Sequence, residues 1–210
     1  MINERFLALP QERQRRLINA GYKVFGLNEY KKASTEEIAR EAGISKGYLF
    51  YYFRNKKALY FYLYECATKL ARTQVMDEGF VRLTDPFEIM DYAAEQKARL
   101  MADYPYLMEF AMRAYASQYE DVSPALDRRI IRETQKIYAG VLAGLDYSRF
   151  RPGVDPIYVL RMLQWMGDGW LREAQRIGAA PTADEMLAEF RRMLGTLRSL
   201  CYKEEEDERD

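Results

Sequence analysis

Apolar residues recur every three or four positions along most of this chain, and runs that alternate apolar and polar residues are almost absent. A period near 3.6 residues indicates amphipathic helices, whereas strict alternation indicates strands. The pattern therefore predicts an all-α protein. Proline, glycine and capping residues mark where the helices are expected to begin and end.

The first 54 residues predict a domain of three helices. One begins at Pro10, a residue favoured in a first turn, and runs to about residue 26, and two shorter helices are expected over 34–42 and 45–52. Because only a tight turn separates the last two helices, we expect a helix-turn-helix, an arrangement that binds DNA.

Local residues specify the geometry of this turn. Ser34 and Glu37 have the spacing of a capping box, in which each side chain bonds the other residue's amide. Gly43 can adopt the left-handed conformation that ends a helix, and Ser45 is placed to cap the next one. The small side chain of Ala39 allows the two helices to approach closely.

The second helix of the pair has two distinct faces. Leu49 and Phe53 lie four residues apart and share the face that turns toward a core. The outer face then carries a lysine and three tyrosines, Lys46, Tyr48, Tyr51 and Tyr52. Hydroxyl and ammonium groups bind phosphates, and the helix that carries them can enter a major groove.

Residues 17–59 resemble the amino-terminal domain of the TetR (tetracycline repressor) family of one-component bacterial regulators. The resemblance is carried by the helix of LINAGYKVFGLNEYKKAS, the A-x-x-A-G-I-S-K-G turn and the aromatic-F-x-x-K ending. It implies a three-helix DNA-binding domain followed by a larger helical domain for ligand binding and dimerisation. By position it also implies which residues touch DNA or set the second helix of the motif against it. They are Thr35, Ser45, Lys46, Gly47, Tyr48, Tyr51, Tyr52 and Lys56.

Beyond residue 54 we expect a helical effector-binding and dimerisation domain over 55–203 and an acidic tail over 204–210. A long helix should continue without a linker from about residue 55 to residue 78. Proline-containing signals and caps predict further helices over 86–103, 105–119, 124–145, 156–177 and 182–202.

The last two predicted helices carry apolar stripes at spacings of three and four, which an internal core must partly use. The stripes are Val159, Met162, Leu163, Met166 and Trp170, and Met186, Leu187, Phe190, Met193, Leu194 and Leu197. The resemblance implies that these helices form a four-helix bundle between two subunits. We therefore expect a homodimer that places two reading heads on one operator.

The middle of the chain is rich in methionine and aromatic residues. Each one fits an ordinary core, but together they favour a pocket for a small hydrophobic molecule, and the resemblance implies an effector in this region. The expected lining is Tyr64, Met101, Met108, Phe110, Met112, Tyr115, Trp165 and Met166. Glu109 and Asp168 are either counter-charges for a cationic effector or solvated surface carboxylates.

Charge is unevenly distributed along a chain whose net charge is zero. Up to Lys57 there are 12 lysines and arginines against 6 acidic residues, and the rest of the chain carries 20 against 26. A positive excess on the segment that holds the motif is the electrostatic signature of DNA binding, because cations that neutralise phosphates release condensed counterions.

The residue types present disfavour an enzyme and a metal or cofactor site. There is no histidine, the commonest general base and zinc ligand, and the two cysteines, Cys66 and Cys201, have no metal-ligand spacing and are expected to be reduced thiols. The chain shows neither a membrane-spanning run nor a secretory signal, so we expect a cytoplasmic protein without a membrane partner.

The expected function is a ligand-responsive transcriptional regulator, most often a repressor in this family, that a small hydrophobic effector releases from double-stranded DNA. The effector would shift the population between two states, and the helix over 55–78 is the element expected to move. The alternative is a helical binding or scaffolding protein without a DNA role. Salt-dependent retention on DNA separates the two.

Overall fold

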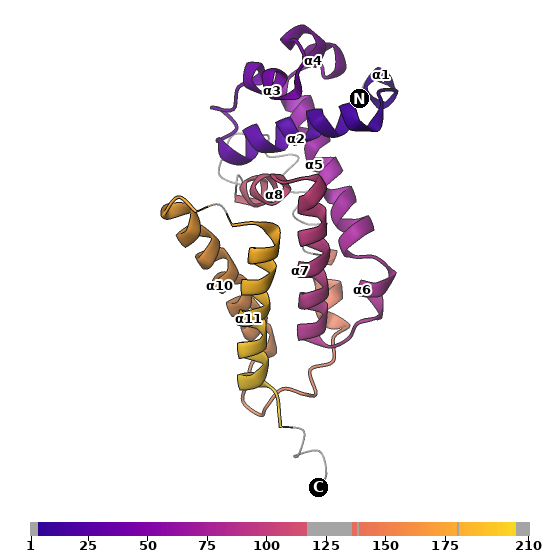
Figure 1. The fold of residues 1–210 in the computed structure, drawn as a ribbon. Coiled ribbons are helices and arrows are strands. Elements are labelled where there is room, and N and C mark those ends of the chain that lie inside the picture. Colours follow the sequence, from indigo (N-terminus) through magenta and orange to yellow (C-terminus); the bar gives the residue numbers. More distant parts are fainter. Residues whose placement is uncertain (1–3, 117–135, 138, 180, 205–210) are drawn as a thin grey trace. The chain divides into compact units, whose positions relative to one another are not determined.

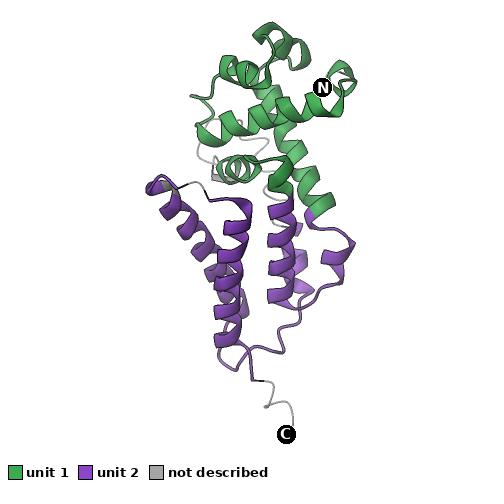
Figure 2. Cartoon of the chain, viewed as in Figure 1, with its two compact units in different colours: residues 1–74, 100–134 green, residues 75–99, 135–210 purple. Residues whose placement is uncertain are grey.

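The computed structural model describes residues 4–116, 136–137, 139–179 and 181–204, and its elements are helices (Figure 1). The one extended pairing among these residues is an isolated antiparallel bridge between Phe150 and Tyr202. The prediction of an all-α protein with an amino-terminal helix-turn-helix is confirmed. The chain divides into two compact units, Met1–Gln74 with Leu100–Thr134, and Val75–Arg99 with Gln135–Asp210 (Figure 2).

The first unit is organised around one long helix. Its helices are α1 (Glu4–Leu7), α2 (Gln11–Leu27), α3 (Thr35–Ala42), α4 (Lys46–Tyr52), α5 (Lys56–Leu70) and α8 (Leu107–Ala116). Helix α2 packs against α3, α5 and α8. A glycine permits the close approach of α2 to α8, since a Cβ on Gly26 would lie 3.0 Å from the backbone nitrogen of Phe110 in α8.

Local signals set the helix-turn-helix largely as expected. Ser34 Oγ accepts from the amide of Glu37 at 3.3 Å, and Gly43 ends α3 with a left-handed φ of 69°. Ser45 Oγ accepts from the amide three residues on at 3.2 Å and so starts α4. The cap at Ser34 is one-sided, because the Glu37 carboxylate pairs with Arg40 at 3.8 Å instead of bonding back to the Ser34 amide.

Helix α1 was not expected from the sequence. Phe6 is fully buried, and its ring packs against Tyr52, Phe53 and Tyr62 with centroids 5.7, 5.0 and 5.3 Å away. A helix of four residues is about one turn long and shows no periodicity, so only its buried aromatic contact identifies it as part of the fold.

The expected continuous helix over 55–78 is correct as far as residue 75 and ends three residues early. Asn55 caps α5 as its Oδ1 accepts from the Ala58 amide at 2.8 Å, but α5 ends at Leu70 and a π-helical segment follows over Ala71–Val75. Asp77 then caps a separate helix, α6 (Glu78–Arg82), by accepting from two backbone amides. A capping aspartate favours a new helix start over continuation of the old one.

The second unit contains α6, α10 (Pro156–Arg176), α11 (Ala183–Cys201) and most of α7 (Pro86–Asp103). The predicted bounds of α7, α10 and α11 are correct to within one residue, and α8 begins two residues later than expected. Most of the helix expected over 124–145 lies outside the described residues, although 139–143 are helical. The core of the unit consists of Phe87, Phe150, Val159, Leu163, Leu194, Cys201 and Tyr202.

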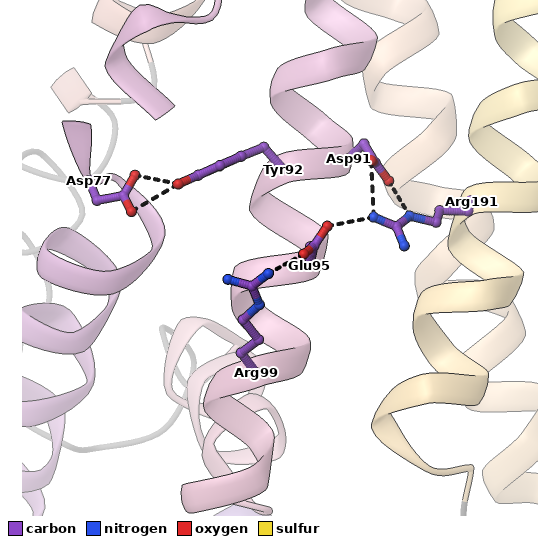
Figure 3. Close-up of polar contacts among 6 residues, drawn as sticks. All are labelled: Asp77, Asp91, Tyr92, Glu95, Arg99 and Arg191. Carbon is purple, nitrogen blue, oxygen red and sulfur yellow. Dashed lines mark hydrogen bonds and ion pairs between the residues drawn. The ribbon is translucent and has the colours of Figure 1, made fainter. Parts of the chain in front are cut away.

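Polar contacts tie α11 to α7 (Figure 3). Arg191 Nε donates to Asp91 Oδ1 at 2.6 Å, and Arg191 Nη2 donates to Glu95 Oε2 at 2.7 Å. From another side of α7, the Tyr92 hydroxyl donates to Asp77 Oδ1 at 2.7 Å, and this bond lowers the pKa of Asp77 from its ordinary value. Helix α7 thus makes polar contacts both with α11 and with Asp77, the residue that caps the start of α6.

Gly26→Ala should lower the free energy of unfolding by about 1–3 kcal/mol, because the added methyl meets α8 backbone that cannot rotate away. Gly47→Ala is the control, since its Cβ would have its nearest neighbour, Ser45 Oγ, at an ordinary 3.7 Å. We expect it to leave the stability unchanged or slightly raised. Denaturant unfolding measures both variants, and an equal loss in the two would contradict the close approach of α2 and α8.

Candidate DNA-binding surface

Helix α4 buries one face and exposes the other. Leu49 and Phe53 are 1% and 2% exposed and turn inward as predicted, whereas Tyr48 is 60% and Tyr51 45% exposed. The rings of Tyr48, Tyr51 and Tyr52 lie between 5.6 and 6.4 Å from one another. The outer face of α4 is therefore a nearly continuous aromatic surface that carries hydroxyl groups.

Helix α1 completes this surface at one edge. Tyr52 is half-buried against Phe6, so it is less exposed than the other two tyrosines. The guanidinium carbon of Arg5 lies 5.0 Å from the centroid of the Tyr51 ring, within the range of a cation–π contact. Arg5 thus adds a cation that the sequence analysis missed, because nothing in the local pattern indicated that this segment packs beside α4.

An ion pair lies at the amino end of α4. The Lys46 ammonium pairs with Oε1 of Glu36, which stands in the first turn of α3. The other carboxylate oxygen accepts from Ser34 Oγ at 3.0 Å and from Thr35 Oγ1 at 3.3 Å. The Lys46 bond above all, and then hydrogen bonds from the Glu36 backbone amide and Ser34, lower the pKa of Glu36 to about 2. Glu36 is not among the predicted site residues, because it lies ten residues from Lys46 in the sequence.

The remaining predicted contact residues differ in exposure. Ser45 and Gly47 are exposed beside Lys46, and Thr35 is nearly buried. Lys56 is half-buried at the start of α5, with its ammonium 4.7 Å from the centroid of the Tyr30 ring. Burial lowers the pKa of Lys56. Its ammonium also donates to the Lys31 carbonyl at 3.4 Å, so the charge lies beside the segment that precedes α3.

The residues predicted to line an effector pocket belong to both units. Phe110 is fully buried, and its ring packs against Tyr22 and Tyr60 at 4.9 and 5.4 Å, so it is part of the core of the first unit. Four others in that unit are half-buried: Tyr64, Met101, Met108 and Met112. Tyr115 belongs to α8, and its side chain is outside the described part. Trp165 and Met166 of α10 are exposed.

A groove of about 430 Å³ lies within the second unit, and the sequence analysis did not predict it. Carboxylates of α7 and guanidinium groups of α11 contribute to its lining, and Figure 3 shows Asp91, Glu95 and Arg191 among them. The lining residues are Leu83, Phe87, Glu88, Asp91, Tyr92, Glu95, Arg191, Leu194 and Arg198. None of the eight predicted effector residues is among them.

The two candidate counter-charges differ in their surroundings. Glu109 of α8 has a buried Oε2 with no hydrogen-bond partner among the described residues, and burial raises its pKa. Asp168 of α10 is half-buried and belongs to the other unit. In the described ranges no three His, Cys, Asp or Glu side chains gather as metal ligands. None of the helices described there is long and apolar enough to cross a membrane.

The predicted stripes of α10 and α11 lie mostly against the core of the unit, where Met162, Phe190, Met193 and Leu197 pack beside the buried residues. Val159, Leu163 and Leu194 are buried in the core of the unit. Other large apolar side chains of the same helices face solvent in the single chain: Tyr158, Trp165, Met166 and Leu200. The Tyr158 and Trp165 rings meet edge to face at 5.9 Å. These helices therefore present an apolar face that the core does not use.

Comparison with known proteins finds a resemblance that covers the helix-turn-helix. Residues 17–63, from α2 into α5, match the family model for bacterial regulatory proteins of the tetR family. None of the curated protein sequences compared with the chain matches it.

Solved structures share the fold along nearly the whole chain. A TetR family transcriptional regulator from Chloroflexus aurantiacus J-10-FL is 22% identical with a TM-score of 0.55, covering 97% of this chain and 100% of that one. The ketosteroid transcriptional regulator KstR2 of Mycobacterium tuberculosis is 16% identical with a TM-score of 0.66, covering 93% and 97%. The fatty acid degradation regulator FadR from Bacillus halodurans is 17% identical with a TM-score of 0.58, covering 87% and 96%.

At these identities the solved structures establish the fold, and the family model identifies the helix-turn-helix. The predicted resemblance to this family is confirmed. Together the findings show that residues 17–63 resemble the amino-terminal domain of bacterial regulatory proteins of the tetR family, and that the chain shares its fold with solved regulators of this kind.

Proposed function

We propose that this protein is a ligand-responsive transcriptional regulator that binds a double-stranded operator as a homodimer and represses until a small hydrophobic effector releases it. The observation that carries the DNA-binding part is the outer face of α4, where a lysine and exposed tyrosines lie on a family-matched helix-turn-helix. Such a protein acts without catalysis or cofactor and in the cytoplasm, beside the chromosome. A scaffold without a DNA role would leave this face unused.

The amino end of α4 is the part that we assign to base edges. In helix-turn-helix proteins the first residues of the second helix enter the major groove. Here those residues include Lys46 and Tyr48, while Tyr51 and Arg5 lie further along the same surface, where phosphate contacts hold the helix in register. The proposed contact set is Thr35, Ser45, Lys46, Gly47, Tyr48, Tyr51, Tyr52 and Lys56, in a reading domain of residues 1–54.

Two substitutions should affect DNA binding in different ways. Tyr48→Ala should change the ranking of bound sequences, because its side chain lies nearest the bases. Lys56→Ala should weaken binding to all duplexes alike and flatten the slope of log K against log salt by about 0.9 per lost phosphate contact. Anisotropy titrations of several duplexes at a series of salt concentrations measure both effects.

Lys69→Ala is the matched control, since Lys69 is an exposed lysine near the end of α5. It should leave both the affinity and the salt slope unchanged. An unaltered ranking of duplexes for Tyr48→Ala would remove that residue from base reading. Equal effects of the two lysine substitutions would remove Lys56 from the phosphate contacts.

The apolar face of α10 and α11 supports the proposed dimer. Tyr158, Trp165 and Met166 recur at helical spacing on one side of α10, and Leu200 of α11 is 62% exposed. Large exposed apolar patches mark interaction sites in soluble proteins, and α10 and α11 pack together. A second copy covering both helices would bury about 2,000 Å² or more, as obligate dimers do.

Trp165→Glu should convert the dimer into a monomer of 24.7 kDa, because it places a charge where the partner's apolar side chains would lie. Trp165 is 53% exposed in the single chain, so the subunit itself should stay folded. Val81→Glu, which changes an exposed residue of α6, should leave the dimer intact. Sedimentation velocity at micromolar concentration reports the mass, and a monomeric unmodified protein would overturn the dimer.

We propose that the effector binds within residues 55–203. In the first unit it would contact some of Tyr64, Met101, Met108, Met112 and Tyr115, beside the buried ring of Phe110. The support is the set of half-buried thioethers and aromatic rings, which suits apolar ligands. One structural neighbour is a fatty acid degradation regulator and another is a ketosteroid regulator, and both names refer to largely apolar compounds.

An effector that favours the released state by about 1–3 kcal/mol should lower operator affinity by about 5–150-fold. The same concentrations should change the tryptophan fluorescence, since Trp165 and Trp170 are the chain's only tryptophans. In Trp165→Phe, Trp170 is the only remaining tryptophan. A fluorescence change in this variant then reports ligand binding without a contribution from Trp165 on the proposed dimer face. Fluorescence changes that occur without release of DNA would contradict the switch.

A further inference from the structure

A carboxylate occupies a position on the DNA-binding surface where phosphates would repel it. The Glu36 side chain is 62% exposed, and it pairs with the Lys46 side chain, which is 51% exposed. If Lys46 stands at the base edges, as the position of α4 requires, then the carboxylate in contact with it stands there too. The repulsion becomes attraction only if the carboxylate meets a hydrogen-bond donor on the DNA.

The position of the Glu36 carboxylate is firmly set. Its Oε2 accepts from both Ser34 Oγ and Thr35 Oγ1, while Oε1 receives the Lys46 ammonium. A side chain with three bonds does not swing away when DNA approaches, and such preorganisation lowers the entropic cost of a new contact. Each carboxylate oxygen can accept more than one hydrogen bond, so a base can still donate to it.

The chemistry of the major groove limits what this pair can read. Cytosine N4 and adenine N6 are the amino donors there, and glutamate and aspartate accept from cytosine N4, whereas lysine donates to guanine O6 and N7. A cytosine and a guanine next to each other, on one strand or across a pair, would satisfy the carboxylate and the ammonium together. An adenine in place of the cytosine also offers an acceptor, N7, which would face the carboxylate unfavourably.

We propose that Glu36 is a specificity-determining residue that accepts a hydrogen bond from a cytosine amino group, with Lys46 donating to the neighbouring guanine. This inference rests on the DNA-binding function proposed above. It also predicts a second effect: Glu36 neutralises Lys46 on random sequence and so weakens non-specific binding, which depends on phosphate contacts alone.

The test is selection of bound duplexes from a random pool with the unmodified protein, Glu36→Gln, Glu36→Ala and Glu37→Gln. The unmodified protein should enrich cytosine at one position of each half-site. Glu36→Gln should shift that position toward adenine, which glutamine bonds through N6 and N7, and reduce the preference for cytosine by about 5–150-fold. Glu36→Ala should lose the preference there and steepen the salt slope, since Lys46 becomes available to a phosphate.

Glu37→Gln removes the same charge from the next residue of the same helix, whose carboxylate pairs with Arg40 at 3.8 Å. Its selected sequences should match those of the unmodified protein. Thermal melting of all variants distinguishes base reading from a purely structural role. A purely structural ion pair between Glu36 and Lys46 would lower the stability when it is removed, without changing the base preference. That outcome, or an unchanged ranking in Glu36→Gln, overturns the inference while the proposed function stands. Failure of the unmodified protein to retain any duplex overturns both.

Discussion

Three-sided packing of α2 is the constraint on which the first unit depends. The helix meets α3, α5 and α8 together, which only small side chains allow: a Cβ on Gly21 would lie 2.4 Å from Leu63, and Gly26 adjoins the backbone of α8. Tyr22 is fully buried between these contacts and donates to the Leu63 carbonyl at 3.2 Å, and burial raises its pKa. Because α3 packs on α2, and Gly43 sets the turn from α3 to α4, the candidate DNA-binding surface depends on this packing for its geometry.

The chemistry that suits DNA is spread over three helices. Helix α4 itself carries no arginine, asparagine or glutamine, the side chains that bond guanine or adenine bidentately. Its lysine and tyrosines are joined by Arg5 from α1 and Glu36 from α3. Cations and hydroxyls supply affinity that salt weakens, whereas a fixed carboxylate can distinguish bases, so in the proposed function affinity and specificity arise from different members of one surface.

In the second unit the same helices must serve a core and an exposed apolar face. Phe87 and Leu194 are buried at the contact of α7 and α11, and Arg191 bonds two carboxylates beside them (Figure 3). Exposed ion pairs contribute only about 0–1 kcal/mol each, so the apolar contacts stabilise the unit and the arginine fixes the register of the two helices. Trp165 and Tyr158 take no part in that core, which leaves them for a partner.

Caps and periodicity act within a few residues, and for that reason the sequence alone determined the helix-turn-helix, its left-handed Gly43 and the bounds of α7, α10 and α11. It could not indicate α1, because that helix is defined by the burial of Phe6 against residues some 50 positions away. It also treated Phe110 and Trp165 as alike, although one is core and the other exposed, since hydrophobicity does not say which face a neighbour covers. Only tertiary structure brought Glu36 to Lys46, as an ion pair between two helices depends on the angle at which they pack.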